Sequence, residues 1–436
     1  MNRTTGIFVL AAAASLAWAV AMRPSPPPEV TFEETGTVMF PQLTDPTQAT
    51  SLEVVAWDDE AATVRRFKVE QKDGVWVIPS HHDYPADAAE RMGKAAAGFV
   101  DVRREIYYGD DPSEHGAFGL LDPEDPGAKA DEKARRFILK DAAGTVLVDV
   151  LVGKPIPGKE GYRYVRLPDD KRVYGAKLDL DISTNFTDWI EKDLLRLDRD
   201  DVVTIVYDPY EVDEAKGRVV GEGALEFRRK KGEGGTFTDE WELGENTKAP
   251  AGKTLDVGKV RSLLGAIDRL QIVGVRPRPE RLTLPLLQSY GFFVNPRTGR
   301  LFGNEGEVSV VEKDGVVYSL FFGEVTFDSG LALTAGKESS SEEGTKGGEA
   351  GGEDEDEGKT GEDGADEGAS KGGGNRYLFV DVGFDPKLVA EGGDPEKGKT
   401  RAEKLRKRFD KWFFVISESS FDQIHKDRDA FFKDAG

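Results

Sequence analysis

The sequence predicts an α+β protein with two tandem homologous modules after an N-terminal membrane helix, each module a mostly antiparallel sheet packed with one or two helices. Three observations lead to this prediction. The chain begins with an uncharged apolar run; polar and apolar residues alternate around short glycine-containing turns, as in β-hairpins; and hairpin and helix signals occur twice in the same order. We expect residues 1–23 to form a signal-anchor, 24–49 a proline-rich extracytoplasmic linker and lead-in, 50–200 the first module, and 201–436 the second.

The uncharged run extends from Gly6 to Met22, with Arg3 before it and Arg23 after it. At about 1.5 Å per residue such a helix covers about 25 Å, which is within the range of membrane-spanning helices. Small residues near its end also fit cleavage of a signal peptide. We favour an uncleaved anchor because Trp18 suits a membrane interface, but cleavage stays open as the alternative. Both interpretations place the rest of the chain outside the cytoplasm.

The first hairpin of each copy carries a tryptophan in its second strand. Residues 65–78 turn at Lys72-Asp73-Gly74, and residues 225–243 turn through a longer glycine-rich stretch. Trp241 in the second copy corresponds to Trp76 in the first. The alternation on both sides of each turn predicts paired antiparallel strands.

A helix is predicted after each of these hairpins. We expect the helices to begin at Asp87 and Asp256, whose side chains can accept hydrogen bonds from the first turn. Glu90, three residues after Asp87, would complete a capping box. Apolar residues at helical spacing predict one buried face on each helix, formed by Met92, Ala95, Ala96 and Phe99 in the first and by Val260, Leu263, Leu264, Ile267 and Leu270 in the second.

Three short signals then recur in both copies. The first is an aromatic–glycine–apolar step, the second a hairpin that closes on a glycine, and the third a strand with an Arg-Tyr pair. In the first copy these are Phe118-Gly119-Leu120, Gly153 and Arg163-Tyr164; in the second they are Tyr290-Gly291-Phe292, Gly323 and Arg376-Tyr377. Their common order indicates a duplicated unit.

The net charge of −22 is unevenly distributed along the chain. Between Glu338 and Gly374 there are 13 acidic residues and 3 lysines, with many glycines and no aromatic residue. This composition predicts a disordered acidic loop over 337–374, inserted within the second module. Calcium capture by this loop is disfavoured, because its glycine spacing forms no cage. Nucleic acid is excluded as a partner, because phosphate binding needs a basic face.

Several of these features together resemble the domain-of-unknown-function 4340 family. They are the tryptophan-bearing hairpin, the Pro-Ala-Asp helix start, the "FGLLDPEDP" step from Phe118, and the Arg-Tyr strand. The resemblance covers residues 67–195 clearly and 227–432 more faintly. It implies a bacterial envelope protein with an accessory role, in some members beside gliding-type ABC transporters, and it carries over no catalytic residue. The acidic loop and a charged insertion at residues 395–411, predicted as a surface helix, depart from the family pattern.

The most reactive-looking stretch is His81-His82-Asp83. A zinc site needs three or four ligands, and the other histidines, His115 and His425, lie far away in the sequence. The corresponding part of the second copy has no histidine. We therefore interpret the pair as a solvated loop, and a ligand or proton-handling site as the alternative. No metal site, cofactor site or catalytic residue is predicted.

Other chemistry-bearing patterns are equally weak. The chain has no cysteine, which excludes disulfides and thiolate chemistry, and no nucleotide-binding or serine-hydrolase motif. Carboxylates such as Asp110, Asp111 or Asp181 could be imagined as a glycosidase pair, but among 81 acidic residues such pairs are inevitable. The basic run 228–231 is interpreted as a hairpin edge and Asn185 as an incidental sequon.

The function predicted from these observations is that of a membrane-anchored extracytoplasmic accessory or scaffold protein, not an enzyme. Its expected partners are envelope or inner-membrane proteins, including ABC transporter subunits, and it would cross the bacterial inner membrane once with its bulk in the periplasm. Two alternatives stay open. One is an envelope hydrolase or glycan-acting enzyme that uses carboxylates; the other is a periplasmic ligand-binding protein.

Overall fold

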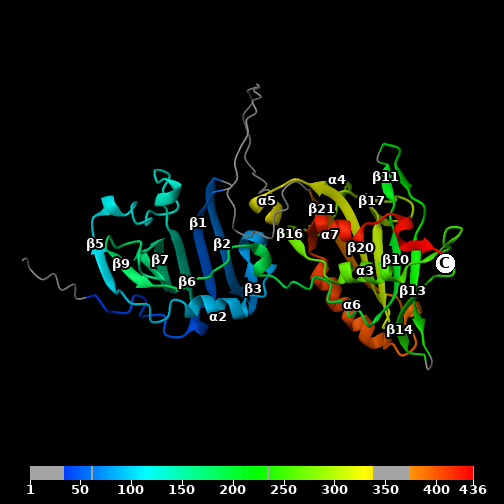
Figure 1. The fold of residues 1–436 in the computed structure, drawn as a ribbon, viewed down its shortest axis with the longest axis horizontal. Helices are drawn as coiled ribbons and strands as arrows, with labels where there is room; N and C mark the ends of the chain where they lie inside the picture. The colour runs from blue at the N-terminus through cyan, green and yellow to red at the C-terminus, as the bar shows by residue number, and fades with distance from the viewer. Residues whose placement is uncertain (1–33, 60–61, 214, 233–234, 337–373, 436) are drawn as a thin grey trace, which may run out of the picture.

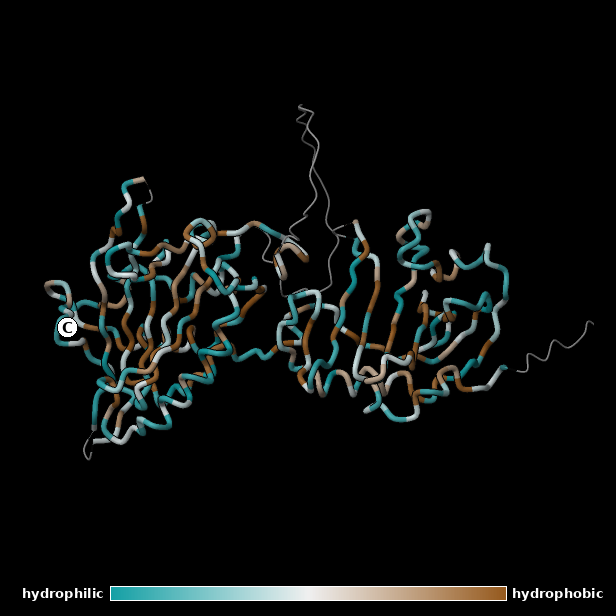
Figure 2. The backbone as a smooth tube through the Cα atoms, turned by 180° about the vertical axis from the view of Figure 1, so that it is seen from behind, coloured by the Kyte–Doolittle hydropathy of each residue, from teal (hydrophilic) through white to brown (hydrophobic). Residues whose placement is uncertain are grey.

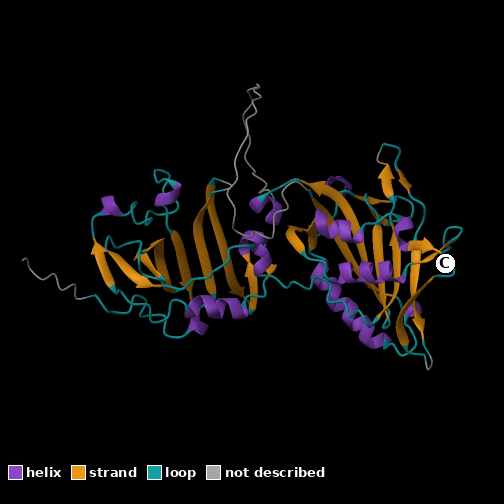
Figure 3. Cartoon of the chain, viewed as in Figure 1, coloured by secondary structure: helices purple, strands orange, loops and turns teal. Residues whose placement is uncertain are grey.

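The computed structural model describes residues 34–59, 62–213, 215–232, 235–336 and 374–435. Two large antiparallel sheets and a few helices make up this part of the chain, so the predicted α+β class is confirmed (Figures 1 and 3). The predicted membrane run 6–22 and nearly all of the acidic stretch lie outside the described residues. Within the described residues, no helix is both long enough and apolar enough to cross a membrane.

The first sheet has nine strands in the order β4-β3-β2-β1-β6-β7-β8-β9-β5. Its strands are β1 (Ser51–Asp58), β2 (Thr63–Lys72), β3 (Val75–Ile78), β4 (Tyr84–Pro85), β5 (Ile106–Gly109), β6 (Arg135–Lys140), β7 (Val146–Pro155), β8 (Tyr162–Arg166) and β9 (Val173–Lys177). Helix α2 (Ala89–Ala97) follows β4. The predicted hairpin turn between β2 and β3 is confirmed, with Asp73 and Gly74 both at positive φ.

The second sheet has eight strands in the order β14-β13-β10-β19-β20-β21-β22-β16. They are β10 (Val202–Asp208), β13 (Leu225–Lys231), β14 (Phe237–Leu243), β16 (Ile272–Pro277), β19 (Glu307–Glu312), β20 (Val316–Thr326), β21 (Asn375–Phe384) and β22 (Trp412–Ser417). Further small pairs are β11 (Glu211–Asp213) with β12 (Arg218–Val220), β15 (Lys253–Leu255) with β23 (Phe432–Asp434), and β17 (Phe292–Val294) with β18 (Leu301–Gly303).

Eight strands of the first sheet, from β3 to β5 across the sheet, follow the same order along the chain as the eight strands of the second. Both sheets also have a shift in strand pairing at the corresponding place. The pairing of β7 with β8 shifts between Val152 and Pro155, and that of β20 with β21 shifts between Phe322 and Val325. In each sheet the shift lies at the predicted closing glycine, Gly153 or Gly323.

Each sheet packs its main helix as the sequence predicted, but only one helix begins where expected. In α3 (Val257–Asp268), the Asp256 side chain accepts from Gly258 N, which confirms that cap. Helix α2 begins two residues after Asp87, and no side chain caps it. The Asp87 main-chain N–H instead donates to Trp189 O at 2.8 Å, so Asp87 joins the neighbouring loop and the predicted capping box with Glu90 is wrong. The predicted apolar faces of both helices are buried.

The stretch before β1 is more than a linker. In residues 34–49, Met39, Phe40 and Leu43 are buried, and the Phe40 ring packs edge-on against Phe99 with centroids 5.9 Å apart. This stretch therefore contributes to the core beside α2.

The second sheet carries additional helices: α4 (Leu284–Ser289), α5 (Gly330–Ala335), α6 (Pro395–Phe409) and α7 (Glu418–Ile424). The surface helix predicted in the charged insertion is confirmed as α6, which begins at the N-cap Asp394. Arg401 of α6 pairs with Glu312 at 2.5 Å and Asp314 at 3.1 Å, and both carboxylates are buried. These ion pairs with buried carboxylates fix α6 on the second sheet, and Figure 1 shows the helix running along that sheet.

Candidate functional site at the junction of the two sheets

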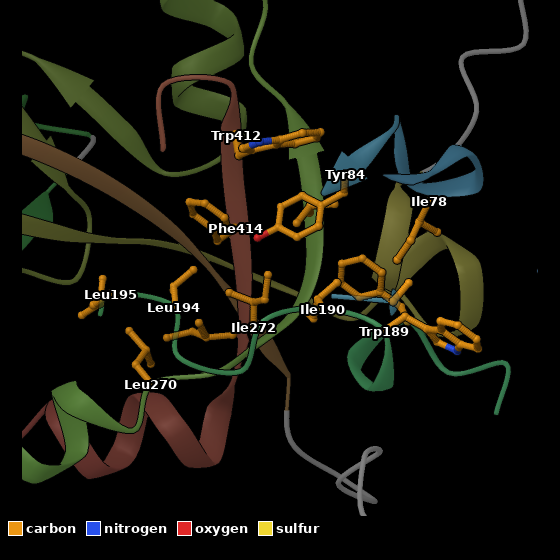
Figure 4. Close-up of a cluster of buried hydrophobic side chains, with 14 of the residues drawn as sticks. Ile78, Tyr84, Trp189, Ile190, Leu194, Leu195, Leu270, Ile272, Trp412 and Phe414 are labelled. Carbon is orange, nitrogen blue, oxygen red and sulfur yellow. The ribbon is translucent and has the colours of Figure 1, made fainter. Parts of the chain in front are cut away.

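The two sheets meet where β3 and β4 approach β16 and β22. Tyr84 and Trp412 pack edge to face there, with ring centroids 4.9 Å apart (Figure 4). The connecting segment adds Trp189, Ile190 and Leu194, all buried. Apolar residues of both sheets belong to one continuous core cluster, and Figure 2 shows apolar residues recurring along the strands on either side of the junction. The junction is therefore a packed interface.

Helix α5 is held against this junction by Arg276 of β16. The guanidinium donates to Ala332 O at 2.7 Å and to Leu333 O at 2.8 Å, so it satisfies carbonyls that a helix end leaves without partners. Close packing adds to this, because a Cβ atom on Gly274 would collide with the Leu333 carbonyl. Glycine at this β16 position allows α5 to approach.

The first sheet holds α5 from the other side through the predicted histidine pair. His81 Nε2 lies 2.9 Å from the Thr334 hydroxyl, and the His81 ring stacks on Phe186 with centroids 4.2 Å apart. His82 Nε2 donates to Ala335 O at 2.7 Å. The interpretation of the pair as a solvated loop is wrong for His81, which is only 3% exposed. Thr334, the partner of His81 Nε2, lies 253 residues away in the sequence, in a helix without a counterpart in the first sheet.

The electrostatics of the junction keep His81 neutral. Burial, with smaller contributions from His82 and Arg276, lowers the pKa of His81 to about 3. His82 and the adjacent Asp83 both adopt positive φ, a conformation that costs on the order of 1 kcal/mol or more for residues other than glycine. Asp83 is held by Lys72 at 2.7 Å, so this strained turn is fixed at both ends.

Two apolar side chains beside this arrangement are exposed. Phe327 is 84% exposed and Leu331 of α5 is 47% exposed. They lie between the end of β20 and the point where the acidic stretch begins. Phe327 is the most exposed of the large apolar side chains in the described residues, since the others are valines and leucines exposed by 43–59%.

The other histidines have separate structural roles. His115 is buried, and its Nε2 donates to Lys171 O at 2.8 Å. His425 caps α7 and stacks on Phe421, and burial lowers its pKa. In the part of the chain that the structure describes, no three histidine, aspartate or glutamate side chains gather as a metal site would require.

A cavity of about 420 Å³ lies between α2 and the segment 179–183. Asp181 lines it together with Glu90 and Lys94, which pair with each other at 2.6 Å. Asp110 and Asp111 do not line this cavity, and Asp111 instead accepts from Ser113 N at the start of a short helix. The cavity therefore does not bring Asp181 together with Asp110 or Asp111 as a glycosidase pair.

The remaining sequence candidates have partners within the chain. In the basic run, Arg228 pairs with Glu226, Arg229 donates to carbonyls of the connecting segment, and Lys231 pairs with Glu391. The sequon at Asn185 overlaps the junction, because the next residue, Phe186, is the one that stacks on His81.

The three recurring short signals meet in each sheet in a contact that we call the glycine contact. In the first sheet, Lys154 N donates to Phe118 O at 3.0 Å, Arg163 donates to Gly153 O at 2.9 Å, and the Phe118 and Tyr164 rings are 4.7 Å apart. In the second, the corresponding residues are Glu324, Tyr290, Arg376, Gly323 and Tyr377, with distances of 2.9, 2.8 and 4.5 Å. The sequence signals were therefore parts of one local structure.

A family model described as Domain of unknown function (DUF4340) matches residues 76–286. This stretch of the chain is similar to the DUF4340 family. The matched stretch begins in β3 and ends in α4, so it crosses the junction and includes His81, His82 and Arg276, but it ends before α5. No curated protein and no solved structure matches the chain.

Proposed function

We propose that this protein is a membrane-anchored extracytoplasmic scaffold that works by protein–protein contact, with the face around α5 as its contact surface. The observation that carries the proposal is the exposed Leu331 on α5, a helix that both sheets hold in place, together with the exposed Phe327 just before that helix. Exposed aromatic and aliphatic side chains on a rigid support are the usual anchors of protein interfaces. Binding there would order few additional groups, because α5 is already fixed.

The envelope location rests on the sequence. The uncharged run Gly6–Met22 has the length of a membrane-spanning helix, and the proline-rich stretch after it would separate the folded part from the membrane. An ABC-type export or gliding-like system is proposed as the partner on the family resemblance. No catalytic step is part of the proposed role.

We further propose that the two sheets are tandem homologous modules. Their common strand order, the pairing shift at the same place and the repeated glycine contact support a duplication. A duplication followed by additions to one copy explains why α5, which carries the contact surface, belongs only to the second.

Site-specific photocrosslinking in native membranes tests the contact surface. A photoreactive phenylalanine analogue in place of Phe327 should crosslink to one membrane partner, whereas the same analogue at Leu388, a matched exposed position at 43%, should not. Equal patterns from both positions, or none from Phe327, would refute the α5 surface. Retention of the full-length chain in membranes after a high-salt wash tests the anchor separately.

A second candidate, binding of a small ligand, is favoured by the cavity beside α2. Its lining combines Glu90, Asp179 and Asp181 with Arg91 and Lys94. Such a mixed lining suits a polar molecule that carries both donors and acceptors. Screening polar metabolites by thermal shift, with Ala95→Trp as the variant that fills the cavity, separates this role from the scaffold.

A further inference from the structure

Helix α6 exposes a row of basic side chains in an otherwise acidic protein. Lys397, Lys404, Lys407 and Lys411 follow one another at intervals of seven, three and four residues, which places them on one side of α6 and its immediate extension. We call these four residues the basic stripe. All four are exposed, and none has an acidic side chain within 4.0 Å among the described residues.

The stripe differs from the neighbouring arginines Arg401 and Arg408 of α6, which already have partners. Arg401 is committed to Glu312 and Asp314, and Arg408 donates to Asp193 O at 3.0 Å. Apolar positions such as Leu405 and Phe409 are buried against the sheet, so the outward face presents charge without apolar surface, and its exposed basic residues outnumber the exposed Glu396 and Glu403. A face of this kind suits an extended polyanion more than an apolar partner.

The chain itself contains a matching polyanion. The stretch Glu338–Gly374 carries a net charge of −10, and both this stretch and α6 are additions to the second sheet. We propose that the basic stripe is the docking surface for this acidic stretch of the same chain. The proposal is independent of the contact role suggested for α5.

The point where the acidic stretch leaves the described residues supports this pairing. It leaves after Gly336, which packs on the Arg276 side chain near the end of β16. Just past that end, the Arg278 N–H donates to Lys411 O at 2.7 Å. The departure point is thus connected through a short piece of β16 to the end of the stripe. Half of the stretch could extend about 60 Å at about 3.3 Å per residue, and α6, with 15 residues, is about 22 Å long. The stretch can therefore run along α6 and return.

The energetics favour a weak docking that depends on the tether. Individual exposed ion pairs contribute little and are screened over about 10 Å at 0.1 M salt. Attachment to the same chain gives the acidic stretch an effective concentration on the order of millimolar near the stripe. Docking should therefore be populated at low salt and lost at high salt, and external polyanions would have to compete with it.

The absence of cysteine from the chain allows a direct test. Spin labels on Ala350→Cys and Thr400→Cys in the full-length protein report the distance between the acidic stretch and α6 by pulsed electron resonance. We expect a short-distance population at low salt that disappears at high salt. The variant K397E/K404E/K407E should lose it at low salt, whereas K171E/K192E/K248E, with the same change in net charge at other exposed lysines, should keep it.

Identical distance distributions in the wild type at low and high salt would overturn the proposal without recourse to any variant. Phosphatidylglycerol vesicles added to the same labelled protein test the main alternative, that the stripe binds an anionic membrane surface. Vesicle binding that requires the stripe, with no short-distance population in the free protein, would assign the stripe to a membrane surface instead. Melting temperatures of the two triple variants check that both remain folded.

Discussion

The glycine contact occurs in both sheets with nearly the same distances, but its arginine is in a different environment in each. Arg163 in the first sheet is exposed and makes one bond, to Gly153 O. Arg376 in the second is 5% exposed, lies 4.1 Å from the Phe421 ring centroid, and has Glu305 and Glu418 at 3.7 Å. Both sheets therefore share the backbone contact. Its contribution to stability differs, because only in the second sheet is the arginine covered by further elements.

The largest effect should come from removing the buried arginine. Arg376→Ala leaves two carboxylates without their cation and Gly323 O without a donor, and should reduce the free energy of unfolding by about 3 kcal/mol. Arg163→Ala removes a single exposed hydrogen bond and should cost about 1 kcal/mol or less. Urea titrations of both variants measure the difference. Equal losses would mean that the burial of Arg376 does not matter energetically.

The glycines should behave alike in the two sheets. A Cβ at Gly153 would collide with Phe118 O, and one at Gly323 would collide with Tyr290 O, so alanine at either position should cost about 2 kcal/mol. Gly93 in α2 is a control, because a Cβ there meets no atom within 4 Å, and Gly93→Ala should stabilise by about 0.5 kcal/mol. A neutral Gly323→Ala would show that the contact in the second sheet can relax, and that the two sheets differ in this respect.

The sequence was informative about this shared framework because its signals are local. Hairpin turns, the Asp256 cap and the apolar helix faces depend on neighbours within a few residues, and the structure has them where predicted. The closing glycines were recognisable as signals, although the sequence alone did not reveal that they and the arginines contact one another.

The junction was not predictable in the same way. His81 has ordinary loop neighbours, and its burial depends on Phe186 and Thr334, which lie 105 and 253 residues away. Asp87 looked like a helix cap because of its local pattern, but its N–H is bound by Trp189 O from another segment. Long-range packing of this kind overrides a local preference that contributes only about 1 kcal/mol.

His81 allows the junction to be tested by a change of pH. The second sheet has no histidine at the corresponding place. The pKa of His81, about 3 in the folded protein, lies below its ordinary value of about 6.5 when unfolded. Between these two pH values the unfolded chain therefore binds more protons at His81 than the folded protein does. The contribution of His81 to the free energy of unfolding is fully present above pH 6.5 and is lost as the pH decreases toward 3. The slope from this residue should approach about 1.4 kcal/mol per pH unit.

His81→Gln keeps a hydrogen-bonding side chain at Thr334 but cannot titrate, so the pH dependence between 6 and 4 should become shallower in this variant. His82→Gln is the matched control, because it exchanges the adjacent exposed imidazole and keeps His81. Urea midpoints at several pH values measure both slopes. If wild type and His81→Gln lose stability in parallel, His81 is not the group that controls the junction.

The smallest effect should come from the largest change in sequence. Deleting Glu338–Gly374 and joining its ends with a short glycine linker should shift the melting temperature by no more than about 2 °C, because closing a long loop costs little more than closing a short one. Docking on the basic stripe would add only weak, salt-screened contacts to the folded state. The shift should therefore be even smaller at 0.5 M salt, where those contacts are screened. A decrease of many degrees at both salt concentrations would instead mean that the acidic stretch packs into the second sheet, and that the two sheets differ in their cores as well as in their surface additions.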